Sequence, residues 1–303
     1  MKKIFVYFIT IISLFLLVAC TSSKPLGATN SFSIEDNLEN GNNVKAKVIL
    51  LFGQSNATGI SSNAYLKENI PNEYEMLSNG IDNVYINFIC ENGSNSSSNK
   101  FINVKPGMGA SKDCFGPELG MAYELSIKYP DETIFIIKYS WAGSILDSQW
   151  LNSRYGRGEL YNAAISFCKT SLNYLKIKGY GIEVEAVCWM QGESDSVQIE
   201  TSNRYYKNTE KFVDYLRRDL SSYTKDDFVF IDAGIKEIDL YWIYYEIINN
   251  TKAEYADKHN NSIYFSTEDL GYTTSLEPID NPDIAHYDSL SEFNLGRKFA
   301  SFI

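Results

Sequence analysis

The sequence is poor in the side chains that hold metals and carry protons. It contains only two histidines, His259 and His286, in 303 residues. Its five cysteines show none of the spacings typical of metal sites; they are Cys20, Cys90, Cys114, Cys168 and Cys188. The sequence therefore predicts no metal site and no cofactor. A serine hydrolase with a histidine base would have to use one of the two histidines.

Positive charge is also in deficit. The chain has 27 Lys and Arg against 38 Asp and Glu, which gives a formal net charge of −11. Such an acidic surface argues against nucleic acid or anionic lipid as the target.

The apolar run at the start of the chain is too short to span a bilayer. It extends from Ile4 to Val18, about 15 residues against the roughly 20 that a spanning helix needs. It follows two lysines and precedes small residues, which is the order of an export signal. We expect residues 1–19 to be removed, which moves the formal net charge from −11 to −13.

Residues 17–20, Leu-Val-Ala-Cys, resemble the lipobox of bacterial lipoproteins. In those proteins the cysteine is diacylated and becomes the first mature residue, which makes Cys20 the expected lipidation site. Two acyl chains anchor a protein stably, so we expect a membrane-anchored protein of the bacterial cell envelope. The alternative is a plain secretory signal, cleaved near Ala19, that leaves Cys20 free. Residues 20–44, rich in Ser, Asn, Gly and Glu, are predicted to form a flexible tether.

Residues 45–303 are predicted to form one α/β domain. Apolar, β-favouring runs alternate with helical patterns, which is typical of a parallel sheet covered by helices on both faces. The predicted strands are 47–52, 133–139, 184–190, 228–232 and 262–265, and the predicted helices are 117–128, 159–176, 204–220, 240–258 and 291–303. We expect a three-layer α/β/α, flavodoxin-like fold with about five parallel strands, in which ligands bind at the carboxyl ends of the strands.

A long segment, residues 61–115, interrupts this alternation. We expect a loop-rich insert with one strand near residues 83–89. Cys90 and Cys114 both lie in it, and an oxidising envelope would allow them to pair, although the sequence does not give the required geometry. Cys168 and Cys188 lie in apolar patterns and are expected to be small buried hydrophobes.

The first strand leads directly into a candidate nucleophile. Leu50-Leu51-Phe52 is followed by Gly53-Gln54-Ser55-Asn56. A glycine permits a sharp turn, and the backbone N–H groups beyond it can face a developing oxyanion. The same pattern also suits an ordinary turn and helix cap.

The two histidines differ in their surroundings. His259 follows a long helical pattern, where its charge would favour the helix C-terminus, so we expect a structural role. His286 follows Asp283 by three residues in a turn, where the carboxylate can bond Nδ1–H and leave Nε2 free to deprotonate Ser55. The alternative is a surface turn in which both side chains only cap the backbone.

A third polar segment follows the apolar strand that ends at Met190. Gln191 is placed to donate its amide to an oxyanion, and Glu193 to hold neighbouring loops. Ser194 and Asp195 are expected to cap the following helix. The rival use of Glu193 and Asp195 is as the paired acids of a glycosidase.

Together these segments, over about residues 45–303, resemble the SGNH hydrolases, specifically the sialate O-acetylesterase and acetylxylan-esterase-like branch. The motifs are Gly53-Gln54-Ser55-Asn56, Gly116-Pro117-Glu118, residues 189–195 and residues 283–289. The resemblance implies Ser55 as nucleophile, His286 as base and Asp283 as its orienting acid, with Gln54, Asn56 and Glu193 in support. It also implies an oxyanion hole made of the Ser55 N–H, the Gln191 side chain and the Gly143 N–H. The family usually has two glycines at 142–143, and this chain has Ala142.

The implied activity is removal of O-acetyl groups from a carbohydrate, such as sialic acid, xylan or another glycan. The alternatives are a non-catalytic glycan-binding lipoprotein of the same fold, and an esterase for lipid or thioester acyl chains. Four aromatic residues on or after the second active-edge loop are candidates for stacking on sugar rings: Trp141, Trp150, Tyr155 and Tyr161.

Overall fold

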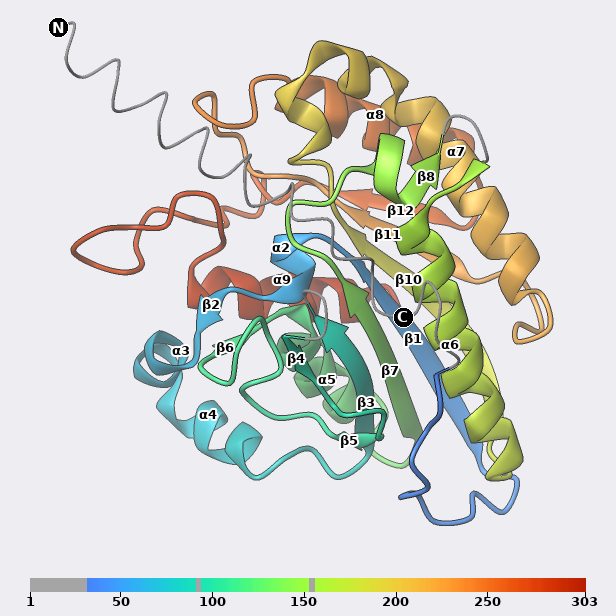
Figure 1. Cartoon of the computed structure of the whole chain (residues 1–303). Coiled ribbons are helices and arrows are strands. Elements are labelled where there is room, and N and C mark those ends of the chain that lie inside the picture. Colours follow the sequence, from blue (N-terminus) through green and yellow to red (C-terminus); the bar gives the residue numbers. More distant parts are fainter. Residues whose placement is uncertain (1–31, 91–93, 153–155) are drawn as a thin grey trace, which may run out of the picture.

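A central β-sheet organises the chain in the computed structural model, which describes residues 32–90, 94–152 and 156–303. The main sheet has eight strands in the order β12-β11-β10-β1-β7-β3-β4, with β5 also paired to β3 (Figure 1). The expected signal peptide and Cys20 lie outside the described residues. No helix within the described ranges is long and apolar enough to cross a bilayer.

Six of the strands run parallel to their neighbours. They are β1 (Lys45–Gly53), β3 (Val84–Cys90), β7 (Thr133–Ser140), β10 (Gly181–Met190), β11 (Val229–Ala233) and β12 (Ser262–Phe265). Short β4 (Asn95–Ser96) and β5 (Ile102–Asn103) pair antiparallel with β3. The structure confirms the five predicted strands and the strand suggested in the insert. They could be recognised in the sequence because strands buried on both faces have nearly continuous apolar sequences.

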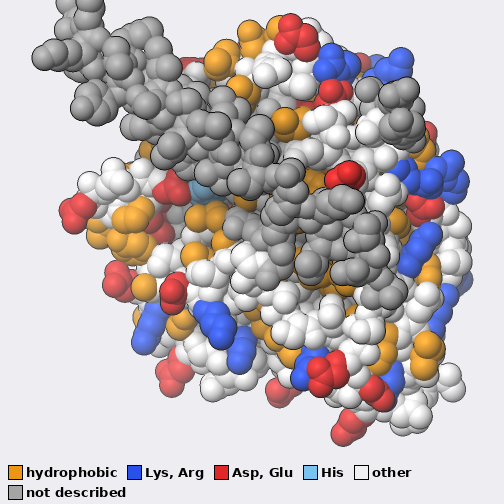
Figure 2. Space-filling model, viewed as in Figure 1, with side chains coloured by type: hydrophobic (Ala, Val, Ile, Leu, Met, Phe, Trp, Pro, Cys, Tyr) orange, Lys and Arg blue, Asp and Glu red, His pale blue; other side chains and the backbone are white. Residues whose placement is uncertain are grey.

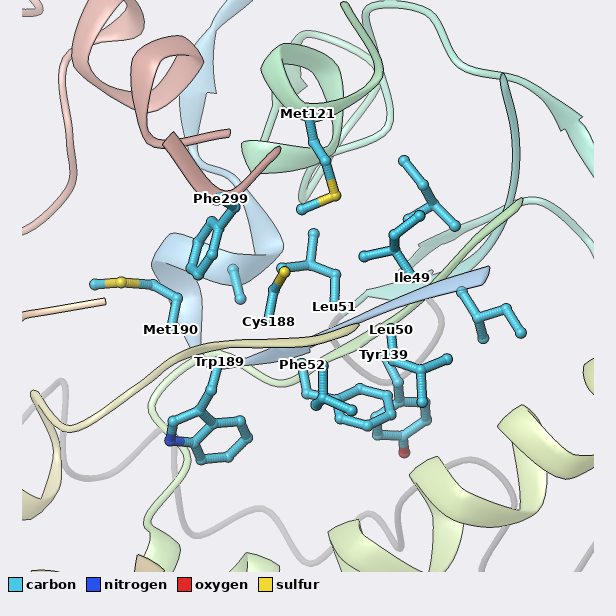
Figure 3. Packing of buried hydrophobic residues seen from close by; sticks show 14 of the residues in the cluster. Ile49, Leu50, Leu51, Phe52, Met121, Tyr139, Cys188, Trp189, Met190 and Phe299 are labelled. Atoms are coloured by element: carbon cyan, nitrogen blue, oxygen red, sulfur yellow. The ribbon is translucent and has the colours of Figure 1, made fainter. Parts of the chain in front are cut away.

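Helices cover both faces of the sheet. The longer ones are α5 (Pro117–Lys128), α6 (Glu159–Ile177), α7 (Ile199–Leu220), α8 (Tyr245–Lys258) and α9 (Ser289–Ser301). Figure 3 shows Met121 of α5 and Phe299 of α9 on the same side of the sheet as Leu51 and Cys188. On the other side, Tyr139 of β7 packs on Phe167 of α6, and Trp189 of β10 on Phe212 of α7, at ring-centroid distances of 6.2 and 4.5 Å. The predicted three-layer α/β/α class is therefore confirmed.

The insert contains more helix than expected. Two short helices, α3 (Asn63–Asn69) and α4 (Pro71–Ser78), follow β2 (Ser61–Ser62), which pairs with β6 (Cys114–Phe115). The only fully buried side chains of these helices are Leu66 and Leu77. Such a sparse apolar pattern explains why no helix was predicted there.

The cysteines of the insert do not form a disulfide. Cys114 carries a free, half-buried thiol. The buried Cys90 Sγ lies 3.8 Å from the carbonyl oxygens of Thr58 and Met108. Cys168 and Cys188 are fully buried, as predicted, and burial raises the pKa of each thiol.

The end of the expected tether packs against the domain. Phe32 meets the edge of Phe167 at a centroid distance of 5.3 Å, and the N–H groups of Asn37 and Leu38 both donate to the Tyr174 hydroxyl at 3.1 Å. Residues 32–44 therefore lie along α6, which differs from the flexible segment expected there; residues 20–31 fall outside the described ranges.

Candidate active site

The carboxyl ends of three neighbouring strands bring the predicted site segments together. Gly53 at the end of β1 pairs with Met190 of β10 on one side and Ser140 of β7 on the other. The Gln54 N–H donates to the Met190 carbonyl at 2.9 Å, and the Trp141 N–H donates to the Gly53 carbonyl at 3.0 Å. The loops after these three strands therefore begin side by side.

Ser55 is the first residue of a short helix, α2 (Ser55–Thr58), directly beyond β1. Gly53 has φ +149°, and a Cβ there would lie 1.9 Å from the Met190 carbonyl oxygen, so only glycine permits this turn. Ser55 is 9% exposed. No described residue accepts a hydrogen bond from its backbone N–H, which leaves this donor at the helix start available.

Asp283 and His286 form a hydrogen-bonded pair in the loop before α9. Asp283 Oδ2 lies 2.7 Å from His286 Nδ1, and Asp283 Oδ1 accepts the Ala285 N–H at 3.1 Å. Burial raises the pKa of Asp283, but the hydrogen bond and charge of His286 outweigh it, so the net pKa is lowered. An ionised Asp283 favours the tautomer with its proton on Nδ1, which leaves Nε2 as the basic atom.

Asn56 connects the segments that carry Ser55 and His286. Its Oδ1 accepts the Tyr287 N–H at 3.3 Å, and its Nδ2 donates to Glu193 Oε1 at 2.8 Å. The neighbour of Ser55 thus contacts the neighbour of His286. The Ser55 hydroxyl and the His286 ring are not hydrogen-bonded to each other here; catalytic hydrogen bonds often tighten only when the substrate is bound.

The buried amides of Gln54 and Gln191 join the loops after β1, β7 and β10. Gln191 Nε2 lies 2.7 Å from Asp195 Oδ2, 2.9 Å from the Ser144 carbonyl and 3.2 Å from Gln54 Oε1. Gln54 Oε1 also accepts the Gly192 and Ser194 N–H groups at 3.4 and 3.3 Å. Both amide hydrogens of Gln191 thus have acceptors within the protein, and its role as an oxyanion donor stays a prediction.

Gly143 lies in the loop after β7, as the predicted oxyanion loop requires. It has φ +67°, a left-handed conformation that favours glycine, and no atom lies within 4 Å of where a Cβ would be. Its N–H has no acceptor among the described residues. Gly143 therefore offers a backbone donor beside open space.

Asp195 does not cap a helix. Its carboxylate is fully buried and accepts the Leu146 N–H at 2.7 Å and the Asp147 N–H at 3.2 Å. Glu193 is 1% exposed, and burial raises the pKa of its carboxyl. Because both carboxyls are enclosed by protein, the paired acids of a glycosidase are not present here.

Two of the four predicted sugar-stacking residues are inaccessible. Trp150 is fully buried and Tyr161 is 1% exposed. Tyr155 lies outside the described residues, so Trp141, which is half-buried, is the candidate that remains. His259 stacks on Tyr255 at 4.0 Å, which agrees with its predicted structural role.

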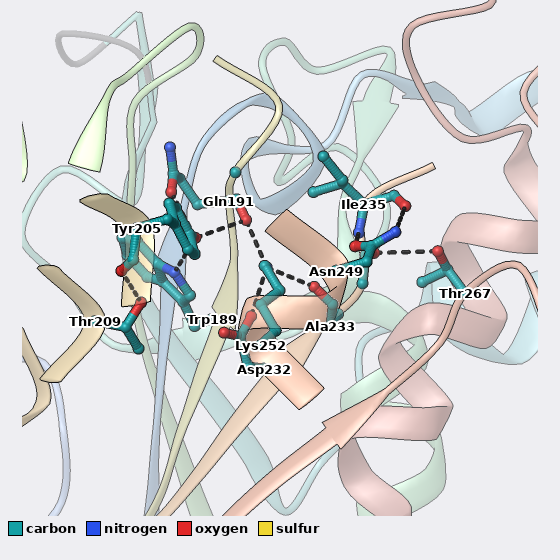
Figure 4. A network of polar contacts seen from close by, with 12 residues as sticks. Trp189, Gln191, Tyr205, Thr209, Asp232, Ala233, Ile235, Asn249, Lys252 and Thr267 are labelled. Carbon is teal, nitrogen blue, oxygen red and sulfur yellow. Dashed lines mark hydrogen bonds and ion pairs between the residues drawn. The ribbon is translucent and has the colours of Figure 1, made fainter. Parts of the chain in front are cut away.

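Two buried lysines beneath the site were missed by the sequence reasoning. Lys252 Nζ donates to the Gln191 carbonyl, the Ala233 carbonyl and Asp232 Oδ1, at 2.6, 2.7 and 2.6 Å (Figure 4). Burial raises the pKa of Asp232 to about 6, although Lys252 opposes this. These contacts fix the backbone at the ends of β10 and β11.

The second buried lysine, Lys138, lies in the middle of β7. Its Nζ donates to the carbonyl oxygens of Thr58 and Met108, at 2.7 and 3.0 Å, and to Glu118 Oε2 at 2.6 Å. Glu118 in turn accepts the Gly116 N–H at 2.9 Å. The sequence could have indicated this buried lysine, because it places a charged residue inside the apolar run Ile-Ile-Lys-Tyr.

Comparisons with known proteins give the family and the fold. The family model for carbohydrate esterase, sialic acid-specific acetylesterase, matches residues 45–303. No curated protein matches the chain. Among solved structures, a protein from Arabidopsis thaliana has a TM-score of 0.62 at 15% identity, covering 84% of this chain and 96% of its own.

Two further solved structures are similar. NanS has a TM-score of 0.63 at 16% identity, covering 88% of this chain and 98% of its own. XAC1771, a carbohydrate acetylesterase from Xanthomonas citri, has a TM-score of 0.53 at 16% identity, covering 84% of this chain and 55% of its own. The family predicted from the motifs is thus confirmed by the family model, and the fold by these structures. The chain belongs to the carbohydrate esterase family of sialic acid-specific acetylesterases and is a carboxylic ester hydrolase that acts on O-acetylated carbohydrate.

Proposed function

We propose that the chain is a serine esterase that removes O-acetyl groups from a glycan through an acetyl-Ser55 intermediate. His286 is the base, Asp283 orients it, and the Ser55 and Gly143 N–H groups stabilise the oxyanion. The observation that carries the proposal is the 2.7 Å contact between Asp283 and His286, in a loop joined to the Ser55 helix by the Asn56–Tyr287 bond.

The proposed reaction has two steps. His286 Nε2 takes the Ser55 proton as the hydroxyl oxygen attacks the acetyl carbonyl, and the sugar hydroxyl leaves with that proton. Water, deprotonated by His286, then attacks the acetyl-enzyme and releases acetate. Loss of one oxyanion donor would lower turnover on the order of 100-fold to 1000-fold.

Acetate release by Ser55→Ala tests the proposal. We expect hydrolysis of 4-nitrophenyl acetate to fall to background in this variant, and peptide mass analysis of the quenched, digested wild type to show one acetyl group on the peptide that contains Ser55. The matched control is Ser78→Ala, an exposed serine on α4 that bonds only the Tyr74 carbonyl among the described residues. Equal rates for Ser55→Ala and the wild type would end the proposal.

The sugar is proposed as an acetylated sialic acid, a xylan or another acetylated glycan. The family assignment supports a carbohydrate ligand. On the face shown in Figure 2, lysine and arginine side chains lie scattered among acidic ones. Acetate release from a panel of defined acetylated sugars identifies the substrate, and a marked preference for acyl chains of eight or more carbons would point instead to a lipid or thioester esterase.

We further propose that Cys20 carries the lipid that anchors the enzyme to the bacterial cell envelope. The Leu-Val-Ala-Cys sequence supports this, and two acyl chains suffice for stable anchoring. In cells labelled with a radioactive fatty acid, wild type is expected to carry label and to sediment with membranes, whereas Cys20→Ala lacks both properties and keeps its esterase activity. Equal membrane association of the two proteins would contradict the anchor.

A further inference from the structure

Asp195 and Gln191 together hold the loop that follows Gly143. Asp195 Oδ2 accepts the Leu146 N–H at 2.7 Å, and its Oδ1 accepts the Asp147 N–H at 3.2 Å. Gln191 Nε2 bridges Asp195 Oδ2 at 2.7 Å and the Ser144 carbonyl at 2.9 Å. The two side chains therefore hydrogen-bond three backbone groups within residues 144–147, the stretch directly after Gly143.

The other end of this loop is fixed as well. The Trp141 N–H donates to the Gly53 carbonyl at 3.0 Å, two residues before the nucleophile. Gly143 lies between the two anchored stretches, has φ +67°, and has no atom within 4 Å of a Cβ position. Gly143 has no side chain whose packing could orient its backbone. The direction of its N–H therefore depends on the hydrogen-bonded residues on either side.

A carboxylate suits this anchoring role. It presents two oxygens that accept several N–H groups at once, and hydrogen bonds to an ionised acceptor are about twice as strong as neutral ones. No lysine or arginine side chain hydrogen-bonds the Asp195 carboxylate among the described residues; the nearby Arg204 pairs with Asp147 instead. All the described donors to the carboxylate belong to the loop after β7 or to Gln191.

We propose that Asp195 is a positioning residue that aims the Gly143 N–H at the carbonyl oxygen of the bound acetyl ester. The inference rests on the proposed function and deepens it, because it assigns the orientation of the oxyanion loop to a buried carboxylate five residues beyond the end of β10. Asp195 touches no reacting atom. It acts through the Leu146 and Asp147 backbone.

The test compares an oxygen ester with its sulfur analogue. Sulfur accepts hydrogen bonds weakly, so a thionoester, with C=S in place of C=O, gains little from an oxyanion donor. We expect Asp195→Asn to lower kcat for 4-nitrophenyl acetate by roughly 100-fold, with little change in KM and a much smaller change for the thionoacetate. The ratio of ester to thionoester rates should fall accordingly.

The matched control is Thr201→Val. The Thr201 hydroxyl donates to the Asp195 carbonyl at 2.6 Å, so this variant perturbs the same residue but leaves its carboxylate contacts intact. We expect its rate ratio to equal that of the wild type. Asp195→Ser is the second variant, because it removes the charge without placing an amide N–H opposite the Asp147 N–H.

Two outcomes overturn the inference: a ratio that is unchanged in a folded Asp195 variant, including equal losses on both esters, or the same fall of the ratio in Thr201→Val. Ser55→Ala, measured on the same esters, separates this result from the proposed function. If the wild-type rate does not depend on Ser55, the proposed function fails. If it does and the ratio is unchanged in Asp195→Asn, only the role of Asp195 fails.

Discussion

At the scale of the residue, the role of Asp283 depends on one hydrogen bond. Its Oδ2 lies 2.7 Å from His286 Nδ1. In Asp283→Asn the amide would favour the wrong imidazole tautomer, so we expect kcat to fall by up to roughly 10,000-fold with little change in KM. Steady-state kinetics on 4-nitrophenyl acetate provides the measurement. Asp280→Asn, an exposed acid in the same loop, is the control, and a variant as active as this control would refute the role.

Asp232 should contribute to the pH dependence of the free energy of unfolding. Burial raises its pKa from 3.8 to about 6, so the folded chain binds more protons than the unfolded chain between these values. The free energy of unfolding therefore decreases as pH rises through this window. Asp232→Asn removes this contribution, and the slope becomes less negative by up to ~1.4 kcal/mol per pH unit.

Urea denaturation at pH values from 4 to 6 measures this slope. Exposed Asp226→Asn is the control and should leave it unchanged. Burial also raises the pKa of Asp195 to about 6. Asp195 therefore contributes to the slope with the same sign, and Asp232→Asn should keep that part of it. Parallel curves for wild type and Asp232→Asn would contradict the assignment.

The candidate reactive groups could be predicted from the sequence more readily than the contacts that support them. Ser55 and His286 could be singled out because one follows a strand–glycine turn and histidines are scarce. The position of the Gln191 amide could not be predicted, since its partners, Asp195 and Ser144, come from two different loops. Asp195 follows Ser194 in a pattern that also suits a helix cap, and only tertiary contacts distinguish the two roles.

At the scale of the elements, Lys138 ties β7 to α2, α5 and the insert. It is fully buried and paired with Glu118, which is also fully buried. Lys138→Met would leave that carboxylate without its cation, so we expect the free energy of unfolding to fall by about 3–5 kcal/mol. The double variant with Glu118→Gln should recover part of this loss. Chemical denaturation of all three proteins checks the prediction, and a single-variant loss below about 1 kcal/mol would contradict it.

Predicted elements agree best with the structure where burial is continuous. The strands of the central sheet were found because both their faces are apolar, as the burial of β1 and β7 illustrates. The predicted helix at 240–258 begins only at Tyr245, because the Tyr244 N–H bonds the Ser196 carbonyl in a loop contact that no local pattern encodes. A helix boundary that depends on a contact with a residue distant in the chain cannot be predicted from the local sequence.

At the scale of the whole molecule, residues 32–44 act as a strap over α6. Besides the contacts of Phe32 and Leu38, Asp36 pairs with Lys178 at 2.9 Å. A chain that begins at residue 45 should be less stable than one that begins at residue 32, by about 1–3 kcal/mol for the lost apolar burial. Thermal unfolding of the two chains measures the difference. We expect kcat to be unchanged, and equal melting temperatures would show that the strap contributes nothing.

The Asn56–Tyr287 bond joins a residue near the start of the domain to one close to its end. On the proposed mechanism, a chain still emerging from the ribosome has its hydroxyl but not yet its imidazole. Ester cleavage therefore begins only after the loop that carries His286 has been made and has met the Ser55 helix. Synthesis from the N-terminus thus keeps a partly made chain inactive.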